Sequence, residues 1–363
     1  MGQITRHDQS SFGTADAADL IANSCNPTLV IDAIDMAGAR AAIELAKAAG
    51  LKLDHAESAH FAPMQEIGFI TTMPGEAVER GDMILWVGST GDLLKTDETA
   101  RRLFNNPISV GANAGKKRKQ LTIAPHGNHP PDHDDITVLD LGDRPLIETL
   151  SMLRARANGR PIAVDGEIQK QIDNAVETLK SAHYGIVAFC AGELSFLEQS
   201  HLMGLVDDLS AETRWSLLPL KLAPGQSELT RMTLALTGLV VPLSFHQGRA
   251  QHDAKLYGVY ETLARGETDL IIWVSASQRT LPRELSNAGK VITITTSTTP
   301  PTGVTAHIQI GAAGIDHDGI LEAPELGSLV CVSPVKEISD LPTAADALGA
   351  LATRVNENLK VTA

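Results

Sequence analysis

The sequence contains few cysteines and few aromatic residues, and these shortages exclude several classes of protein. Only three of its 363 residues are cysteines, and Cys25, Cys190 and Cys331 lie far apart. They form no C-x-x-C pair and match no zinc or iron–sulfur spacing, so we predict a protein of a reduced compartment without a cysteine-bound metal or cluster. Aromatic residues make up 4% of the chain, so aliphatic side chains must fill its core.

The chain also lacks an excess of positive charge and a long apolar run. Its formal net charge is -14, which excludes nucleic acid and anionic membranes as expected partners. The one basic run, Lys116–Lys119, is interpreted as a solvated turn, with an anion contact as the alternative. No apolar stretch reaches membrane-spanning length, and the polar start of the chain has no signal-peptide core. We therefore expect a cytoplasmic protein.

Complete catalytic motifs are absent, and the partial ones have structural explanations. No G-x-S-x-G nucleophile motif occurs. Gly88–Asp92 follows an apolar run but lacks the lysine of a phosphate-binding loop, so close packing explains its glycines equally well. His201 falls on an apolar helical face and is interpreted as a core histidine, while His246 and Arg249 share a turn that is structural or ligand-binding. Asp316–Gly319 begins like a calcium loop without its final glutamate. We therefore predict no catalytic and no cofactor-binding residue.

The segment His126–Asp135 carries the densest group of possible metal ligands. It combines three histidines with aspartates, a pairing that can bind zinc. No helical spacing fixes two of these side chains on one face, and two prolines stiffen the segment. A solvated loop is the favoured interpretation and a metal site is the alternative.

What the sequence does contain is a clear strand-and-helix unit over Thr28–Gly50. Thr28–Ile31 is apolar and partly β-branched, which predicts a buried strand. From Met36 onward apolar residues recur at helical spacing, and Gly50 stands where a helix would end. Ligands of open α/β sheets bind at such a junction, because helix N–H groups converge there.

The rest of the chain alternates short strands with helices. The pattern predicts strands at residues 67–72, 83–87, 121–124, 136–141, 186–190, 215–220, 270–274, 307–310 and 329–332. It predicts helices at residues 74–80, 97–104, 146–157, 168–182, 193–209, 228–236, 255–264 and 344–359. The Thr- and Pro-rich tract 295–303 is interpreted as a linker or an exposed turn.

Two segments of the chain nearly repeat each other. Arg80–Ser89 and Arg265–Ala276 each run from Arg-Gly through an acidic residue and an apolar strand to Trp-Val and a small-residue turn. This similarity predicts two α/β domains with mostly parallel sheets. We assign residues 20–145 with 305–363 to the first domain, residues 146–304 to the second, and residues 1–19 to an N-terminal extension.

The order and spacing of several segments resemble a known family. The matching segments are Ala42–Ala46, Met64–Phe69, Gly75–Gly88, Leu236–Gly238, Phe245–Arg249 and Leu263–Glu267. In this order they resemble the B subunit of formylmethanofuran dehydrogenase, a member of the molybdopterin oxidoreductase superfamily. The resemblance implies two Rossmann-like, three-layer domains with a molybdopterin-oxidoreductase-like core.

The departures from that family concern its redox centre. The family's cysteine cluster for an iron–sulfur centre has no counterpart before Cys25, which implies that the iron–sulfur domain is missing. The position of its tungsten or molybdenum ligand, a cysteine or selenocysteine, is Met36 here. A neutral thioether is a poor substitute for a thiolate on a high-valent metal. We therefore interpret Met36 as a lost metal-ligand position.

A metal-free relative of this kind is similar to the B subunit of bacterial formyltransferase/hydrolase complexes. That resemblance implies a non-catalytic structural or scaffold role alongside the A, C and D subunits. By the same resemblance, the complex converts formyl-tetrahydromethanopterin to formate during formaldehyde oxidation, through a methanofuran-type carrier. One alternative is an active tungsten or molybdenum formylmethanofuran dehydrogenase chain with Cys25 as its metal ligand. Another is a nucleotide-binding enzyme that uses Gly88–Asp92.

Overall fold

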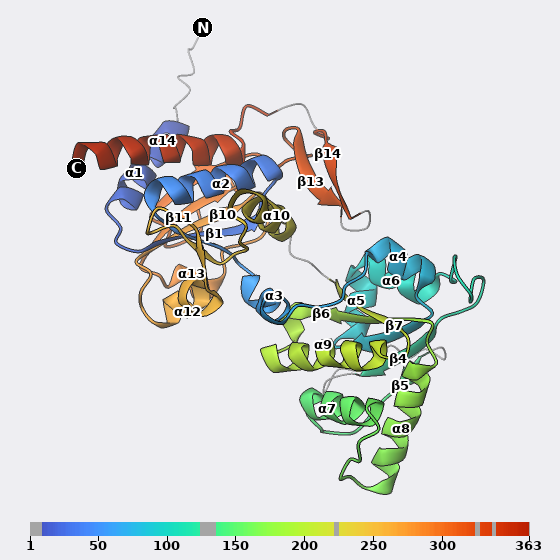
Figure 1. Ribbon diagram of the computed structural model, residues 1–363. Helices are drawn as coiled ribbons and strands as arrows, with labels where there is room; N and C mark the ends of the chain where they lie inside the picture. The colour runs from blue at the N-terminus through green and yellow to red at the C-terminus, as the bar shows by residue number, and fades with distance from the viewer. Residues whose placement is uncertain (1–8, 124–135, 221–224, 324–326, 336–338, 363) are drawn as a thin grey trace. The chain divides into compact units, whose positions relative to one another are not determined.

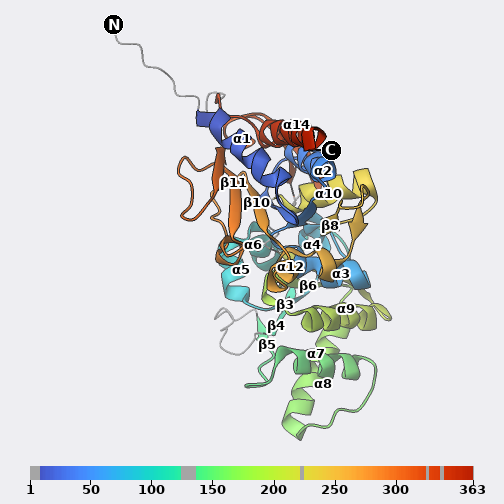
Figure 2. The same cartoon turned by 90° about the vertical axis from the view of Figure 1, so that its left-hand side faces the viewer.

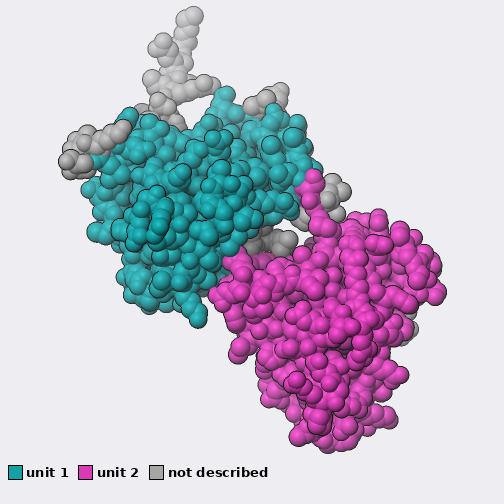
Figure 3. All heavy atoms as spheres, in the orientation of Figure 1, with its two compact units in different colours: residues 1–59, 223–322, 329–363 teal, residues 60–222, 323–328 magenta. Residues whose placement is uncertain are grey.

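The computed structural model describes residues 9–123, 136–220, 225–323, 327–335 and 339–362, which form two compact units (Figures 1 and 3). Unit 1 combines residues 1–59, 223–322 and 329–363, and unit 2 combines residues 60–222 and 323–328. No helix among the described residues is both long enough and apolar enough to cross a membrane.

Unit 1 is built on a seven-stranded sheet with the order β12-β11-β10-β1-β2-β8-β9. The five strands from β12 to β2 are parallel, and β8 and β9 are antiparallel additions. The strands are β1 (Pro27–Ala33), β2 (Lys52–His55), β8 (Leu243–Ser244), β9 (Gln251–His252), β10 (Leu270–Ser275), β11 (Lys290–Thr295) and β12 (Ala306–Gln309). A separate two-stranded ribbon consists of β13 (Gly319–Ala323) and β14 (Ser328–Val332).

Helices cover both faces of this sheet. They are α1 (Gln9–Ala22), α2 (Met36–Ala49), α10 (Gln226–Thr237), α11 (Ala254–Tyr257), α12 (Val259–Ala264), α13 (Arg283–Ser286) and α14 (Ala344–Thr362). Helices α2 and α14 pack against each other, with α1 beside α14 and α10 beside α2, as Figure 2 also shows. Successive residues of the strands point to opposite faces of the sheet and pack in two cores. One core contains Leu29 and Ile31, and the other contains Val30 and Trp273.

Unit 2 is built on a parallel sheet with the order β5-β4-β3-β6-β7. Its strands are β3 (Met83–Val87), β4 (Lys119–Ile123), β5 (Thr137–Val138), β6 (Tyr184–Cys190) and β7 (Arg214–Leu220). Its helices are α3 (Ala62–Ile67), α4 (Pro74–Arg80), α5 (Thr90–Thr96), α6 (Glu98–Asn105), α7 (Leu146–Ala157), α8 (Gly166–Lys180) and α9 (Phe196–Ser210). Two buried clusters again lie on opposite faces of the strands.

The α2 junction follows from local sequence chemistry. Asp35 caps the helix, because its carboxylate accepts a hydrogen bond from the Gly38 amide at 2.9 Å. Gly50 ends the helix in the left-handed conformation, with φ of 63°, and its amide bonds back to Ala46. The predicted strand and helix of this unit are confirmed.

The strands of the near-repeat lie in different sheets, as the prediction of two α/β domains requires. β3 is the central strand of unit 2 and β10 lies inside the sheet of unit 1.

The domain boundaries differ from those assigned from the sequence. Residues 60–145 lie with unit 2 because β3 pairs with β6, and residues 223–304 lie with unit 1 because β10 pairs with β1. Residues 1–19 also fall within unit 1, where α1 packs on α14.

Three predictions about single elements are wrong. Residues 67–72 form no strand: Ile67 ends α3, Ile67 and Ile70 are 50% and 47% exposed, and only Thr71 makes a bridge, to Leu217. The helix predicted over 255–264 is divided at Gly258 into α11 and α12. The strand predicted over 136–141 is reduced to Thr137–Val138. Helix α1 and strands β2, β11 and β13 were not expected.

Candidate functional site

The candidate site lies at the carboxyl ends of β1 and β10 in unit 1. From β1 the chain proceeds through α2 to β2 on one side, whereas β10 is followed by β11 and β12 on the other side. The direction of the strand order therefore reverses between β1 and β10. Ligands of open α/β sheets bind at this kind of switch point, beyond the carboxyl ends of the strands.

Charged side chains of the protein itself occupy the switch point. Asp32 near the end of β1 is completely buried, and its carboxylate accepts hydrogen bonds from Ser275 Oγ at 2.8 Å and Ser277 Oγ at 3.3 Å. Arg279 Nη1 donates to the same carboxylate at 2.9 Å, and its Nη2 donates to Glu57. A buried carboxylate is stable only when it is paired and hydrogen-bonded, and Arg279 and the two serines meet that need.

His55 connects this network to β2. Its ring is fully buried, with Nε2 at 2.9 Å from the carbonyl oxygen of Asp32. Its Nδ1 accepts a hydrogen bond from the Glu57 amide at 3.1 Å. These two partners assign the proton to Nε2, so the imidazole is neutral and both ring nitrogens are engaged. His55 therefore has no nitrogen left for a substrate.

Asp54 is the most perturbed carboxyl group beside this network. Complete burial raises its pKa to about 7, and hydrogen bonds from Ser58, Val259 and His55 offset only part of that rise. The Val259 amide opens α12 and donates to Asp54 at 2.8 Å. Asp54 therefore joins β2 to the start of α12.

Met36 is the first residue of α2 and is half-buried. Asp35 caps this helix, and its charge acts on Glu228, which also interacts with Glu322. Burial raises the pKa of Glu228, and the neighbouring charges of Glu322 and Asp35 raise it further. A neutral thioether is a weak donor to a high-valent metal, so Met36 does not suit the role of a tungsten or molybdenum ligand.

Cys25 lies at the amino end of β1, whereas Met36 follows its carboxyl end. It precedes β1, and its amide donates to Asp269 at 2.7 Å, just before β10 begins. The seven residues of β1 separate it from the start of α2, a distance of about 20 Å at the rise of a strand. Cys25 therefore cannot replace Met36 as a ligand at that helix. Cys190 ends β6 of unit 2, and Cys331 lies on β14 of unit 1. Over the described parts of the chain, no group of three or more His, Cys, Asp or Glu residues could hold a metal ion.

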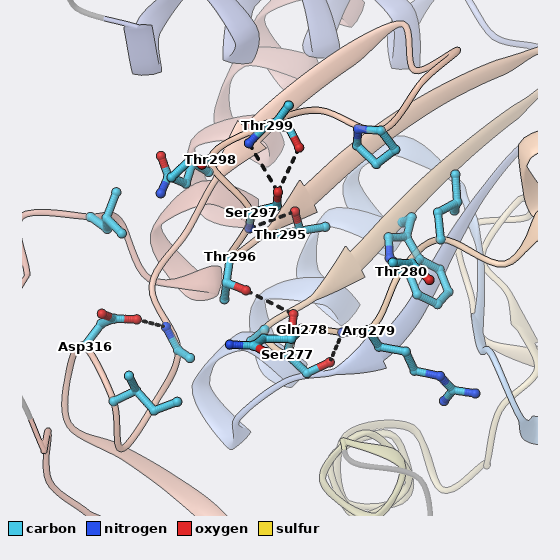
Figure 4. A pocket seen from close by; sticks show the side chains of 18 of the residues that line it. Ser277, Gln278, Arg279, Thr280, Thr295, Thr296, Ser297, Thr298, Thr299 and Asp316 are labelled. Carbon is cyan, nitrogen blue, oxygen red and sulfur yellow. Dashed lines mark hydrogen bonds between the residues drawn. The ribbon is translucent and has the colours of Figure 1, made fainter.

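A cavity of about 930 Å³ opens at the carboxyl ends of β10, β11 and β12 (Figure 4). Ser277 to Leu281 follow β10 on one side, and Thr295 to Thr299 follow β11 on the other. Ser277 and Thr296 connect the two turns, because Thr296 Oγ1 donates to the Ser277 carbonyl at 3.0 Å. The tract 295–303, interpreted from the sequence as a linker or an exposed turn, therefore forms one wall of this cavity.

The turn Gly88–Asp92 holds an anion that the chain supplies itself. The carboxylate of Glu193 accepts a hydrogen bond from the Ser89 amide at 2.8 Å. Gly88 has φ of 101°, and a Cβ there would lie 2.8 Å from the same carboxylate. The glycine is needed for this close approach, in agreement with the packing interpretation.

The basic run Lys116–Lys119 is only partly solvated. Arg118 is buried, 6% exposed, and its guanidinium donates to the carbonyls of Gly81, Leu103, Asn106 and Val78. Burial lowers the pKa of Arg118 to about 10. The prediction of a solvated turn is therefore wrong for this residue, which ties β4 to α4 and α6.

The other sequence candidates lie apart from the switch point. His201 is half-buried rather than a core residue, and its Nδ1 lies 2.9 Å from the Leu197 carbonyl. His246 and Arg249 belong to an exposed turn that packs near Gly50, beyond the far end of α2. Asp316 stabilises its own turn by accepting from the Ala312 amide. The segment His126–Asp135 falls in the undescribed stretch 124–135.

Sequence reasoning missed the residues that fill the switch point. Asp32, His55 and Arg279 come from three separate parts of the chain, and no spacing connects them. One local signal was present: Asp32 and Asp35 come within four residues of the apolar run Thr28–Ile31, near the strand end where α/β sheets place functional polar residues.

No family model matches the chain. It is 26% identical over 355 residues to the B subunit of the formyltransferase/hydrolase complex Fhc of Methylorubrum extorquens, an alignment that covers 94% of this chain and 93% of that protein. The chain is similar to the Fhc B subunit over nearly its whole length. It is also 24% identical over 221 residues to the B subunit of the tungsten-containing formylmethanofuran dehydrogenase 2 of Methanococcus maripaludis, which covers 59% of this chain and 50% of that relative.

A solved structure confirms the fold. A chain in the crystal structure of the formyltransferase/hydrolase complex FhcABCD from Methylorubrum extorquens, in complex with methylofuran, matches with a TM-score of 0.84. The match covers 99% of both chains at 23% sequence identity. The resemblance to the Fhc B subunit and the α/β fold with mostly parallel sheets, both predicted from the sequence, are therefore confirmed.

Proposed function

We propose that this chain is the structural, non-catalytic B subunit of a formyltransferase/hydrolase complex. The observation that carries the proposal is the alignment with the Fhc B subunit, which spans 94% of this chain and 93% of that protein. A match over both full lengths involves both α/β units. It thus supports a shared role for the whole chain.

The donor set at the start of α2 supports a role without metal chemistry. In this chain that position is Met36, an uncharged thioether that follows the capping residue Asp35. Met36 does not fit a tungsten or molybdenum centre, since a thioether is a weak, uncharged donor and the nearest cysteine in sequence, Cys25, lies at the other end of β1. At the switch point, the side chains of Asp32, Arg279 and Glu57 are bonded to one another, and they occupy the position where a ligand of such a sheet would bind. The function that remains is to present two folded units to partner subunits.

The partners follow from the relative. The similar solved chain comes from an FhcABCD complex with methylofuran. By analogy, the proposed partners are the A, C and D subunits, with a methanofuran-type carrier in the complex. The proposed reaction of the whole complex is conversion of formyl-tetrahydromethanopterin to formate, in the cytoplasm, during formaldehyde oxidation.

Purification of the tagged chain from its own organism tests this proposal. We expect three further subunits at fixed stoichiometry and no stoichiometric tungsten, molybdenum or iron by elemental analysis. Complexes reassembled with and without this chain should differ in stability and yield, while a Met36→Ala variant should assemble and turn over like wild type. A chain that purifies alone, or an assembly that is unaffected when this chain is omitted, would contradict the proposal.

The second candidate is an active tungsten or molybdenum formylmethanofuran dehydrogenase chain. The similarity to the Methanococcus maripaludis protein favours it, although that alignment spans only half of the relative. This candidate requires viologen-linked oxidation of the formyl group that is abolished by Cys25→Ser. Because Cys25 lies at the amino edge of the sheet, we expect Cys25→Ser to leave the complex unchanged.

A further inference from the structure

The cavity at the carboxyl ends of β10 to β12 is lined by polar groups that the protein does not use internally. The side chains of Gln278, Thr280, Thr298 and Thr302 line it, and none of them makes a hydrogen bond to another described residue. In Figure 4 the first three project from the turns that follow β10 and β11. Such groups remain solvated in the free protein, so they are available to a ligand without the loss of an internal bond.

The charges on the cavity wall are unevenly balanced. Arg279 is paired with Asp32 and Glu57 and contributes little free charge. Arg283 at the start of α13 also lines the cavity, and within the described chain its guanidinium has no ion-pair or hydrogen-bond partner. Among the described residues that line the cavity, Asp316 is the one carboxylate, and it accepts a hydrogen bond from the Ala312 amide at 2.9 Å. An unpaired guanidinium is therefore the main charged group available to a ligand.

The size and the position of the cavity also favour a ligand site. The cavity of about 930 Å³ lies near the upper end of the usual range for small-molecule sites, roughly 300–1,000 Å³. It adjoins the switch point, where Ser277 belongs both to the Asp32 network and to the cavity wall. Inorganic phosphate alone would fill only a small part of this volume.

We propose that this cavity binds a small organic anion through its phosphate or carboxylate oxygens. Arg283 supplies the charged contact, and the hydroxyls and amide of Thr280, Thr298, Thr302 and Gln278 supply neutral hydrogen bonds. Binding involves no covalent or redox step. The site belongs entirely to unit 1, so the inference does not depend on the identity of the partner subunits.

Calorimetric titration of the purified full-length chain tests the proposal, with AMP, citrate and inorganic phosphate as probes. We expect saturable binding of AMP or citrate, tighter than that of inorganic phosphate. Arg283→Ala should weaken binding at least about tenfold, since a hydrogen bond to a charged group contributes about 1.5 kcal/mol or more. Arg249→Ala, at an exposed arginine of the same unit outside the cavity, is the matched control and should bind like wild type.

Two further variants locate the ligand. Trp273 lines the cavity, whereas the other two tryptophans lie in unit 2, so binding should change a fluorescence signal that Trp273→Phe removes. Asp316→Asn should tighten binding, because it removes the negative charge on the wall. Thermal unfolding of each variant verifies that it is folded. The proposal is overturned if neither organic anion binds better than inorganic phosphate, or if folded Arg283→Ala binds as tightly as wild type.

Discussion

Asp54 should give the stability of unit 1 a pH dependence that a single substitution removes. Its carboxyl group is completely buried and accepts hydrogen bonds from the His55 and Val259 amides, each at 2.8 Å. Burial raises its pKa from 3.8 to about 7 in the folded protein. In the unfolded chain the group is solvated and returns to its ordinary pKa.

The sign and size of the effect follow from proton linkage. Between about pH 4 and pH 7 the folded state holds one proton on Asp54 that the unfolded state has released. The free energy of unfolding therefore falls as pH rises through this interval. About three pH units at roughly 1.4 kcal/mol each give a loss of about 4 kcal/mol at most. Asp54→Asn keeps the shape of the side chain and cannot titrate.

The measurement is urea unfolding of wild type and Asp54→Asn at several values between pH 4.5 and 7.5. Trp273 fluorescence reports on unit 1, because the other two tryptophans lie in unit 2. We expect the stability of wild type relative to the variant to decrease steadily as pH rises. Asp318→Asn, at an exposed carboxyl of the same unit, controls for general charge effects. A wild-type–variant difference that stays constant over this pH range would refute the linkage argument.

Three predictions concern unit 2, and each is measured as a change in its free energy of unfolding. Arg118→Met leaves four carbonyls without their donor and should cost about 3–5 kcal/mol, whereas the exposed Lys117→Met should cost little; equal effects would contradict the burial argument. Gly185→Ala should cost about 2 kcal/mol or more, because its Cβ would lie 2.2 Å from a tryptophan ring. Gly166→Ala meets nothing within 4 Å and should be neutral or slightly stabilising, so a similar loss there would count against this reasoning. Glu193→Ala removes the acceptor of the Ser89 amide hydrogen bond and should cost about 1–2 kcal/mol. An unchanged stability would show that water replaces this bond.

Local signals in the sequence predicted most single elements. The α2 unit combines an apolar strand, helical spacing and a terminal glycine, and each of these features acts within a few residues. The prediction failed at residues 67–72, where an apolar composition matched that of a strand. Most of that segment makes no sheet pairing, and Ile67 and Ile70 remain about half exposed. Composition indicates which segments can pair, but only the fold determines which do.

The domain boundaries and the site depend on contacts between distant residues. The sequence does not reveal that β1 pairs with β10 rather than with β3, so the two domains were divided at the wrong connections. In the same way, Arg118 looks like one member of an exposed basic run until four carbonyls of two distant segments surround it. Glu193 reaches Ser89 across 104 positions of sequence. None of these pairings leaves a periodic or spaced pattern.

The pairing of β1 with β10 has a consequence for synthesis of the chain. Residues 27–33 emerge from the ribosome early, but their partner at residues 270–275 emerges much later, and α14 follows last. Unit 2, by contrast, consists almost entirely of one continuous segment, residues 60–222, which contains every strand of its sheet. The middle of the polypeptide should thus acquire protease resistance first, while the leading segment waits. A nascent chain stalled just after β10, while β10 is still inside the ribosomal tunnel, should resist proteolysis in its middle segment and remain cleavable near its start.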